Sequence, residues 1–265
     1  MAPHMTQNVA RTAALVAVLL CALGAGAYLL LGAGNQARSV SVSHAVAQPM
    51  TGAMPGLMIS MTLENSGAPV MFSAISSPVA GNTHIMGGEL DEIVLPGEGT
   101  FSFALDGAHV MMMAVSGDLD VGRLVPLQFT LGDGSILKTQ VTIAGADRMD
   151  HSMHSGMQGM SIDPLPVISL RARIDDASGQ WVVSSDVQDF TFDTEFVDTQ
   201  HVPGAGHGHL YLNDVKLGRY YGGDFVIGYL PKGDHRVRLD LNTNLHQPYV
   251  VDGEAVSGSL VVSVP

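Results

Sequence analysis

The chain has 265 residues, of which 46% are hydrophobic and only 14% are charged. Its 25 acidic and 12 basic residues give a formal net charge of -13, which argues against a nucleic-acid partner, because phosphates are neutralised by Lys and Arg. A single cysteine excludes a disulfide framework, whereas methionine (15) and histidine (11) are abundant. The apolar fraction is too high for disorder, and recurring turn and β-branched residues predict an all-β protein.

The N-terminal region contains an uncharged, strongly apolar stretch at residues 12–34. It is long enough to span a bilayer, for which about 20 apolar residues suffice. We therefore predict an N-terminal transmembrane anchor at residues 1–38, with one span in a bacterial inner membrane and the body in the periplasm. The alternative is a cleaved signal peptide that releases the body into the periplasm. Cys21 follows two leucines rather than a small residue, which disfavours a lipid-modified cysteine.

Two β-rich regions follow the anchor, at residues 39–145 and 165–265. In both, short apolar runs alternate with Gly, Pro, Asn and Asp clusters, and no stretch keeps a helical period. The pattern predicts two β-sandwich domains, the second immunoglobulin-like in size. Residues 146–164 lack apolar periodicity and predict a flexible linker between the two domains.

The individual strands are predicted from the apolar runs and the turns between them. Predicted strands of the first domain are 56–65, 70–78, 100–105, 109–115, 125–131 and 136–143. Those of the second domain are 166–174, 181–187, 209–214, 224–230, 235–241 and 257–264. Asn213-Asp214 and Asp252-Gly253 are typical of tight hairpin turns.

The first domain contains two His-x-Met motifs, His84-x-Met86 and His109-x-Met111. Because alternate residues of a strand share a face, each motif would present an imidazole and a thioether together. Two such strands side by side would offer two nitrogen and two sulfur ligands. Neutral, soft thioethers favour Cu(I) over Zn, Ca or Mg. The alternative is that the methionines fill the core and the histidines make structural hydrogen bonds.

Residues 42–143 resemble the periplasmic copper chaperone family PCuAC, in the runs LMISMTLENSG, SAISSPVAGNTHIM and GAHVMMM. The resemblance implies a cupredoxin-like β-sandwich that holds Cu(I), and in some members Cu(II), for delivery to cytochrome oxidase. It also implies that His84, Met86, His109 and Met111 are ligands. The segment between the two motifs departs from the family pattern, because it is short and lacks the usual methionine. Met86 is expected to take that methionine's place.

The predicted linker contains a dense group of soft and imidazole ligands. These are Met149, His151, Met153, His154, Met157 and Met160. The run MDHSMHSGMQGM has no other apolar residue to pack with, and it resembles the Met/His-rich repeats of copper-resistance proteins. Such adaptable tracts can capture Cu(I). The alternative is a plain tether that happens to be rich in methionine.

The second domain contains several histidines. His207 and His209 share a strand face, and with His246 from a late loop they would form an imidazole site suited to Cu(II) or Zn. His201 is a weaker candidate, and His235 suits a structural hydrogen bond at a strand start. The runs HVPGAGHGHLYLND, GRYYG and LPKGDHRVRLDLNTNLH are similar to a bacterial β-sandwich module found near copper proteins. This similarity implies a fold rather than a chemistry.

Together these patterns predict an extracytoplasmic copper metallochaperone and not an enzyme. Its cargo would be Cu(I), with Cu(II) as a possible additional cargo, and its partner a copper-accepting or copper-donating protein such as the cytochrome oxidase assembly machinery. The sequence has no nucleophile elbow, no phosphate-binding glycine loop and no cysteine for a blue-copper site in the predicted domains. The alternatives are copper sequestration for resistance, and a structural pair of sandwiches without metal.

Overall fold

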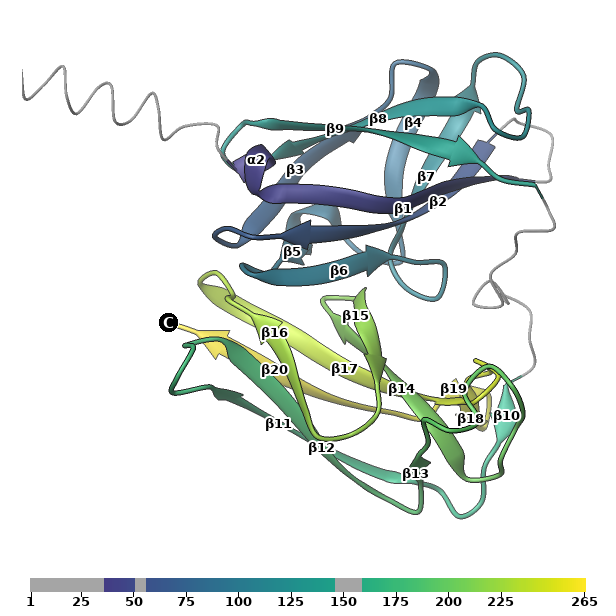
Figure 1. The fold of residues 1–265 in the computed structure, drawn as a ribbon, viewed down its shortest axis with the longest axis vertical. Helices are drawn as coiled ribbons and strands as arrows, with labels where there is room; N and C mark the ends of the chain where they lie inside the picture. The colour runs from purple at the N-terminus through teal and green to yellow at the C-terminus, as the bar shows by residue number, and fades with distance from the viewer. Residues whose placement is uncertain (1–35, 51–55, 146–158) are drawn as a thin grey trace, which may run out of the picture.

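The computed structural model describes residues 36–50, 56–145 and 159–265. Apart from a short helix α2 (Gln36–Ser39) and a 3-10 turn η1 (Leu90–Glu92), these residues form strands and loops, which confirms the predicted all-β class. Figure 1 shows two β modules, one above the other, which we call the first and the second module. No helix in the described ranges is long and apolar enough to cross a membrane, and the predicted span at residues 12–34 lies outside them.

The first module is built from long, mostly antiparallel strands around an aromatic core. They are β1 (Val40–Pro49), β2 (Gly56–Asn65), β3 (Val70–Ser76), β4 (Ala80–Met86), β5 (Val94–Leu95), β6 (Gly99–Phe103), β7 (His109–Val115), β8 (Leu124–Leu131) and β9 (Ile136–Ile143). The rings of Phe72, Phe101, Phe103 and Phe129 are buried with neighbouring centroids 5.1–6.4 Å apart. Each buried ring contributes about 1.5–3 kcal/mol, so this cluster anchors the module.

The second module has a central strand buried on both faces. Its strands are β10 (Met160–Ser161), β11 (Val167–Ile174), β12 (Trp181–Gln188), β13 (Thr191–Phe192), β14 (Ala205–Leu212), β15 (Val215–Tyr220), β16 (Asp224–Gly228), β17 (Gly233–Thr243), β18 (Tyr249–Val251), β19 (Glu254–Ala255) and β20 (Ser257–Val264). β14 lies between β15 and β17 and is buried at every position. Its first five residues, which are small residues and imidazoles, are therefore enclosed within the sheet.

Both predicted hairpin turns are confirmed. Asn213 and Asp214 join β14 to β15 with φ values of 46° and 66°. Asp252 and Gly253 join β18 to β19 with φ values of 53° and 85°. Two successive left-handed residues match the twist of a two-residue hairpin, which is why Asn, Asp and Gly occupy these positions.

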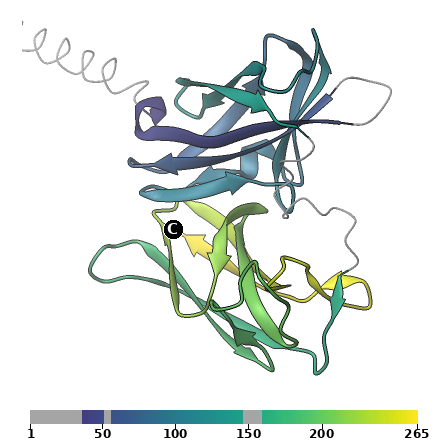
Figure 2. The ribbon, with the colours of Figure 1, turned by 45° about the vertical axis from the view of Figure 1, so that its right-hand side comes forward.

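The two modules pack directly against each other, a contact that the sequence did not predict (Figure 2). Lys216 of β15 pairs with Ser102 of β6, so one path of hydrogen-bonded strands runs through both modules. Gly97 and Tyr229 exchange two backbone hydrogen bonds of 2.8 Å. Apolar residues of β14 and β15 also belong to the hydrophobic cluster of the first module. The interface between the modules is therefore part of the same hydrophobic core as the first module.

Candidate metal centres

Strands β4 and β7 bring the two His-x-Met motifs together. In their antiparallel register His84 lies opposite Met111, and Met86 lies opposite His109. Residues directly opposite each other in such a pair have Cβ atoms about 4.5–5.5 Å apart and point to the same side. The four side chains therefore form a compact group, which we call the His/Met face. Its two nitrogen and two sulfur donors are the set predicted from the sequence.

The His/Met face is partly open to solvent. Met86 is 45% exposed and Met111 is 7% exposed, while the two histidines are half-buried. Met112, next along β7, is fully buried in the core. Alternation along the strand thus separates a methionine that faces the donors from one that fills the core. The predicted alternative, methionine as core filler, holds for Met112 but not for Met86.

The hydrogen bonds of the two imidazoles leave donor nitrogens without competing partners. Nδ1 of His109 lies 3.1 Å from the carbonyl oxygen of Gly107, which leaves Nε2 for another interaction. Nδ1 of His84 is buried and has no hydrogen-bond partner in the described part of the chain. Buried ring nitrogens are normally satisfied, so an orphaned one fits a ligand that is absent from the structure. The donors present therefore fit a soft metal ion.

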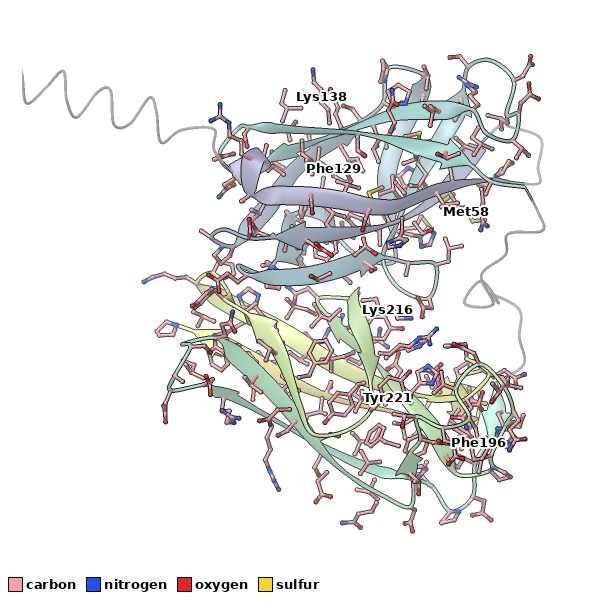
Figure 3. All side chains as sticks on the ribbon, viewed as in Figure 1. Met58, Phe129, Lys138, Phe196, Lys216 and Tyr221 are labelled. Atoms are coloured by element: carbon pink, nitrogen blue, oxygen red, sulfur yellow. The ribbon has the colours of Figure 1, made fainter. Side chains whose placement is uncertain are left out.

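Met58 extends the His/Met face and was missed by the sequence analysis. Met58, labelled in Figure 3, lies opposite Met111 on the other side of β7. His84, Met111 and Met58 therefore form a row across β4, β7 and β2. Met58 is half-buried, whereas its neighbours Leu57 and Ile59 are fully buried. The alternation in GLMISM contained this signal, because it puts Met58 on the face opposite to Leu57 and Ile59.

A second group of donors lies in the second module, where His207, His209 and His246 meet. One ring nitrogen of each lies within 4.8 Å of the others. His207 and His209 come from β14, with their Nε2 atoms 3.1 Å apart. β17 is paired to β14, so the turn that follows β17 brings His246 beside His207, with ring centroids 4.6 Å apart. We call this group the imidazole centre.

The backbone at His246 is held in an uncommon conformation. Its φ of 64° lies in the left-handed region, which few residues other than glycine adopt. A backbone hydrogen bond of 3.0 Å from His246 to Thr243 closes the turn. Such conformations persist only where the surrounding structure enforces them, and they gather at functional sites.

Carboxylates hold two of the three imidazoles from behind. Oδ2 of Asp106 lies 2.9 Å from Nδ1 of His209, and Asp198 accepts a hydrogen bond from Nε2 of His246. Each carboxylate also binds a cation: Lys216 lies 2.7 Å from Asp106, and Arg219 lies 3.2 Å from Asp198. Carboxylate–histidine pairs of this kind orient the ligands of metal ions. None of these four residues was among the predicted site residues.

The imidazole centre is uncharged at neutral pH. Burial lowers the pKa of His207 to about 2. Burial also lowers the pKa of His209 to about 4, although the hydrogen bond to Asp106 opposes the change. Burial also lowers the pKa of His246. Burial alone would raise the pKa of Asp106, but His209 and Lys216 together hold it well below its usual range. Neutral imidazole is the form that ligates metals.

The donor set of the imidazole centre fits a divalent metal. Three neutral nitrogens with an open position suit Zn(II) or Cu(II). Nδ1 of His207 is buried and makes no hydrogen bond within the described residues, as expected for a ring whose interactions are incomplete. The structure therefore brings together the three histidines that the sequence singled out for this kind of site.

The other predicted candidates lie elsewhere. His235 is buried, and its Nε2 lies 2.9 Å from the carbonyl oxygen of Pro231, the structural contact considered for it. His201 lies near the ring of Tyr249 and outside the imidazole centre. Met160 lies in β10 and packs against a small hydrophobic cluster rather than in an extended linker. The other five predicted linker ligands lie outside the described residues, namely Met149, His151, Met153, His154 and Met157.

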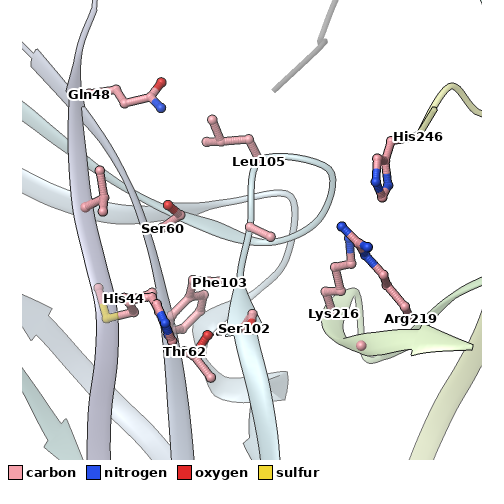
Figure 4. A pocket seen from close by; sticks show the side chains of 14 residues that line it. His44, Gln48, Ser60, Thr62, Ser102, Phe103, Leu105, Lys216, Arg219 and His246 are labelled. Atoms are coloured by element: carbon pink, nitrogen blue, oxygen red, sulfur yellow. Dashed lines mark hydrogen bonds between the residues drawn. The ribbon is translucent and has the colours of Figure 1, made fainter. Parts of the chain in front are cut away.

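A pocket of about 440 Å³ lies between the modules and reaches the imidazole centre (Figure 4). Lys216, Arg219 and His246 line its wall from the second module. Thr62 and Ser102 are among the residues of the opposite wall. His246 is thus the residue of the imidazole centre that lines this pocket at the junction of the two modules.

Known proteins match the chain over its first module. Residues 40–143 match the family model "Putative lipoprotein LpqE-like". Solved structures that match include the copper-bound PCuAC domain from PmoF2, with 17% identity, a TM-score of 0.36, and coverage of 40% of this chain and 93% of that one. The matched structure is a PCuAC domain, the family that residues 42–143 resemble in sequence.

Two further solved structures match the same part of the chain. The apo PCuAC domain from PmoF1 is 18% identical, with a TM-score of 0.36 and coverage of 40% of this chain and 95% of that one. The Cu(I) form of DR1885 from Deinococcus radiodurans is 25% identical, with a TM-score of 0.32 and coverage of 40% and 76%. A search of curated proteins finds no match. Because these TM-scores are low, the metal ligands of this chain are inferred from its own residues and not from the matched structures.

Proposed function

We propose that this protein is an extracytoplasmic copper-binding protein that holds Cu(I) on the His/Met face and passes it to a partner. The observation that supports this most is the register of β4 and β7, which sets His84 opposite Met111 and Met86 opposite His109. This register assembles two imidazoles and two thioethers from residues 23–27 positions apart in the chain. The proposed role is binding and transfer, not catalysis.

The donor chemistry favours Cu(I) over other biological cations. Thioethers are soft, neutral ligands with little affinity for Zn, Ca or Mg, and they suit the low-coordinate geometries of Cu(I). Because a thioether does not bind protons at physiological pH, the sulfur ligands do not compete with protons for their site. Met58, opposite Met111 on β2, offers a third thioether on the same side of the sheet.

The exposure of the His/Met face favours transfer over storage. Met86 is 45% exposed, so a partner's ligand can approach the ion from that side while Met111 holds it from the buried side. Transfer by ligand exchange needs such an open edge. The acceptor that we propose is a protein with a soft copper site, such as a cytochrome oxidase assembly factor, as the PCuAC resemblance implies.

The proposed location rests on the N-terminal sequence and on the family match. The matched family is described as a lipoprotein family, and the apolar stretch at residues 12–34 is long enough to hold the protein at a membrane. The only thiol of the chain, Cys21, lies within that stretch. Both observations support a body placed outside the cytoplasm, where methionine and histidine replace thiolates as copper ligands.

X-ray absorption spectroscopy of the Cu(I)-loaded full chain tests this function. With one equivalent of Cu(I), the proposal predicts a first shell that contains both sulfur and nitrogen scatterers. Replacing Met86 and Met111 together by Leu should remove most of the sulfur contribution while the nitrogen contribution persists. A shell of nitrogen alone in the native chain would rule out the His/Met face as the carrier site.

A further inference from the structure

The imidazole centre takes its supporting groups from both modules. Its three ligand candidates lie on β14 and after β17, in the second module. Asp198, which supports His246, also belongs to the second module. Asp106, which supports His209, lies in the loop of residues 104–108 between β6 and β7, in the first module.

We propose that the imidazole centre is a divalent-metal site completed at the junction of the modules, with Asp106 as a positioning residue for His209. A metal bound by the second module then also fixes the loop of the first module that reaches it. The inference rests on metal binding by His207, His209 and His246, and not on Cu(I) binding by the His/Met face. Either one can therefore fail without the other.

Asp106 determines which nitrogen of His209 faces the centre. A carboxylate accepts hydrogen bonds, so the contact of 2.9 Å requires Nδ1 of His209 to carry the proton. Nε2 then has its lone pair directed toward His207, whose own Nε2 lies 3.1 Å away. Without Asp106, the ring of His209 would lose both the tautomer and the orientation that metal binding requires.

Asp106 also offsets a nearby positive charge. The ammonium of Lys216 lies 3.2 and 3.3 Å from the two ring nitrogens of His209, where it would repel an incoming cation. Asp106 binds this ammonium at 2.7 Å, and Asp198 binds Arg219 in the same way behind His246. The carboxylate of Asp106 contacts both Lys216 and His209. It therefore offsets the charge of the ammonium and also orients the imidazole ring.

The loop of residues 104–108 is docked on the second module by further contacts. The amide of Ala108 donates a hydrogen bond of 3.0 Å to the carbonyl oxygen of Asp214, and the hydroxyl of Tyr211 donates one of 3.1 Å to the carbonyl oxygen of Asp106. These bonds hold the loop beside β14 whether or not His209 is ligated. Metal binding would add one fixed point, at the Asp106 carboxylate itself.

The chemistry of the centre selects the class of metal. Three neutral imidazoles without thiolate or thioether ligands suit borderline divalent cations, and the general order of affinities places Cu(II) above Zn(II). His246 lines the pocket between the modules, which provides the entry route. The proposed ligand is therefore Cu(II) or Zn(II), with Cu(II) bound more tightly.

Competition titrations of the full chain, purified in detergent, test the proposal with Zn(II) and with Cu(II). The variant His207→Gln identifies which binding event belongs to the imidazole centre. At that site, Asp106→Asn should weaken the affinity for both metals by about 10–100-fold, the usual cost of removing a carboxylate that supports a ligand. Asp91→Asn, which replaces an exposed carboxylate of the same module, should leave the affinity unchanged.

A second variant separates positioning from simple damage to the fold. Lys216→Gln removes the ammonium that competes for His209 and should raise the affinity of the site. A general loss of structure at the interface would instead lower the affinity in both variants. Asp106→Asn with native affinity, or Lys216→Gln with lowered affinity in a folded chain, would overturn the role given to Asp106.

Hydrogen exchange provides a readout that is independent of affinity. Zn(II) should slow amide exchange in the loop of residues 104–108 in the native chain but not in His207→Gln. If Zn(II) binding leaves amide exchange in this loop unchanged, the first module does not complete the metal site, and that part of the inference is wrong. If His207→Gln binds Zn(II) as tightly as the native chain, the imidazole centre holds no metal and the inference fails, while Cu(I) binding at the His/Met face is untouched.

Discussion

At the residue scale, two adjacent methionines of β7 have opposite roles. Met111 faces His84 across the strand pair, whereas Met112 is fully buried in the core. We expect Met111→Leu to weaken Cu(I) binding at least about tenfold, because a ligand is lost while the volume is conserved. The same exchange at Met112 should leave Cu(I) affinity unchanged and cost less than about 1.5 kcal/mol of stability. Chelator competition and denaturant unfolding measure the two effects, and equal Cu(I) affinities of the two variants would contradict these roles.

The buried histidines of the imidazole centre predict a dependence of stability on pH. In the unfolded chain their pKa is near 6.5, whereas in the folded chain the pKa is about 4 for His209 and about 2 for His207. Between pH 6.5 and 4 the unfolded chain therefore binds more protons. The free energy of unfolding is highest above pH 6.5 with respect to these groups, and it falls as the pH drops through this window.

The double variant His207→Gln, His209→Gln should lose much of this acid sensitivity. Denaturant unfolding at a series of pH values, with a metal chelator present, compares its slope between pH 6.5 and 4 with that of the native chain. Asp106 contributes little to this slope. Its pKa is 3.8 in the unfolded chain and lower in the folded chain, so it changes the free energy of unfolding mainly below pH 3.8. Identical slopes would show that these histidines are not held neutral by the fold.

At the element scale, the strand pair β4–β7 determines whether four donors face the same side. His84 and Ile85 are neighbours on opposite faces of β4, and Ile85 packs against the core. Exchanging the two, as His84→Ile with Ile85→His, keeps the composition but moves the imidazole to the core side. We expect the loss of tight Cu(I) binding and a destabilisation of about 1–3 kcal/mol from a buried polar ring. Retention of tight Cu(I) binding would contradict the proposed geometry.

Strands with clear apolar runs could be predicted from the sequence, and those rich in small or polar residues could not. The bounds of β2, β7, β9 and β20 match the predicted ranges. In contrast, β4 and β15 were not among the predicted strands, because AGNTHIM and VKLGRY contain few apolar residues. β14 begins four residues before its predicted start, since its Gly and His residues are buried between β15 and β17 and need no apolar pattern.

Some residues of the two metal centres could be predicted from the sequence, and others could not. Each His-x-Met pair and the pair His207 and His209 follow from the two-residue period of a strand. Asp106 could not be found in this way, because it lies 103 residues before His209 and meets it only through the packing of the modules. Asp198 and the turn at His246 likewise depend on tertiary structure. Sequence periodicity identifies donors on one strand, but not the groups that support them.

At the scale of the whole molecule, the predicted linker should supply additional, weaker copper sites. Replacing Met149, His151, Met153, His154 and Met157 by Ser tests this, with Met160 kept because it packs in β10. We expect fewer bound equivalents of Cu(I) in equilibrium dialysis and an unchanged affinity of the tightest site. An unchanged stoichiometry would show that the linker is only a tether.

A Cu(I) titration of the full chain against a chromophoric chelator tests most directly whether the His/Met face holds Cu(I). The native chain is compared with a variant in which His84, Met86, His109 and Met111 are all replaced by Ala. A matched control replaces His235 by Gln, a histidine held by a structural hydrogen bond outside both centres. We expect the quadruple variant to lose one tight equivalent of Cu(I) and the control to retain it. Equal tight binding by the native chain and the quadruple variant would contradict the assignment of the His/Met face as the carrier site.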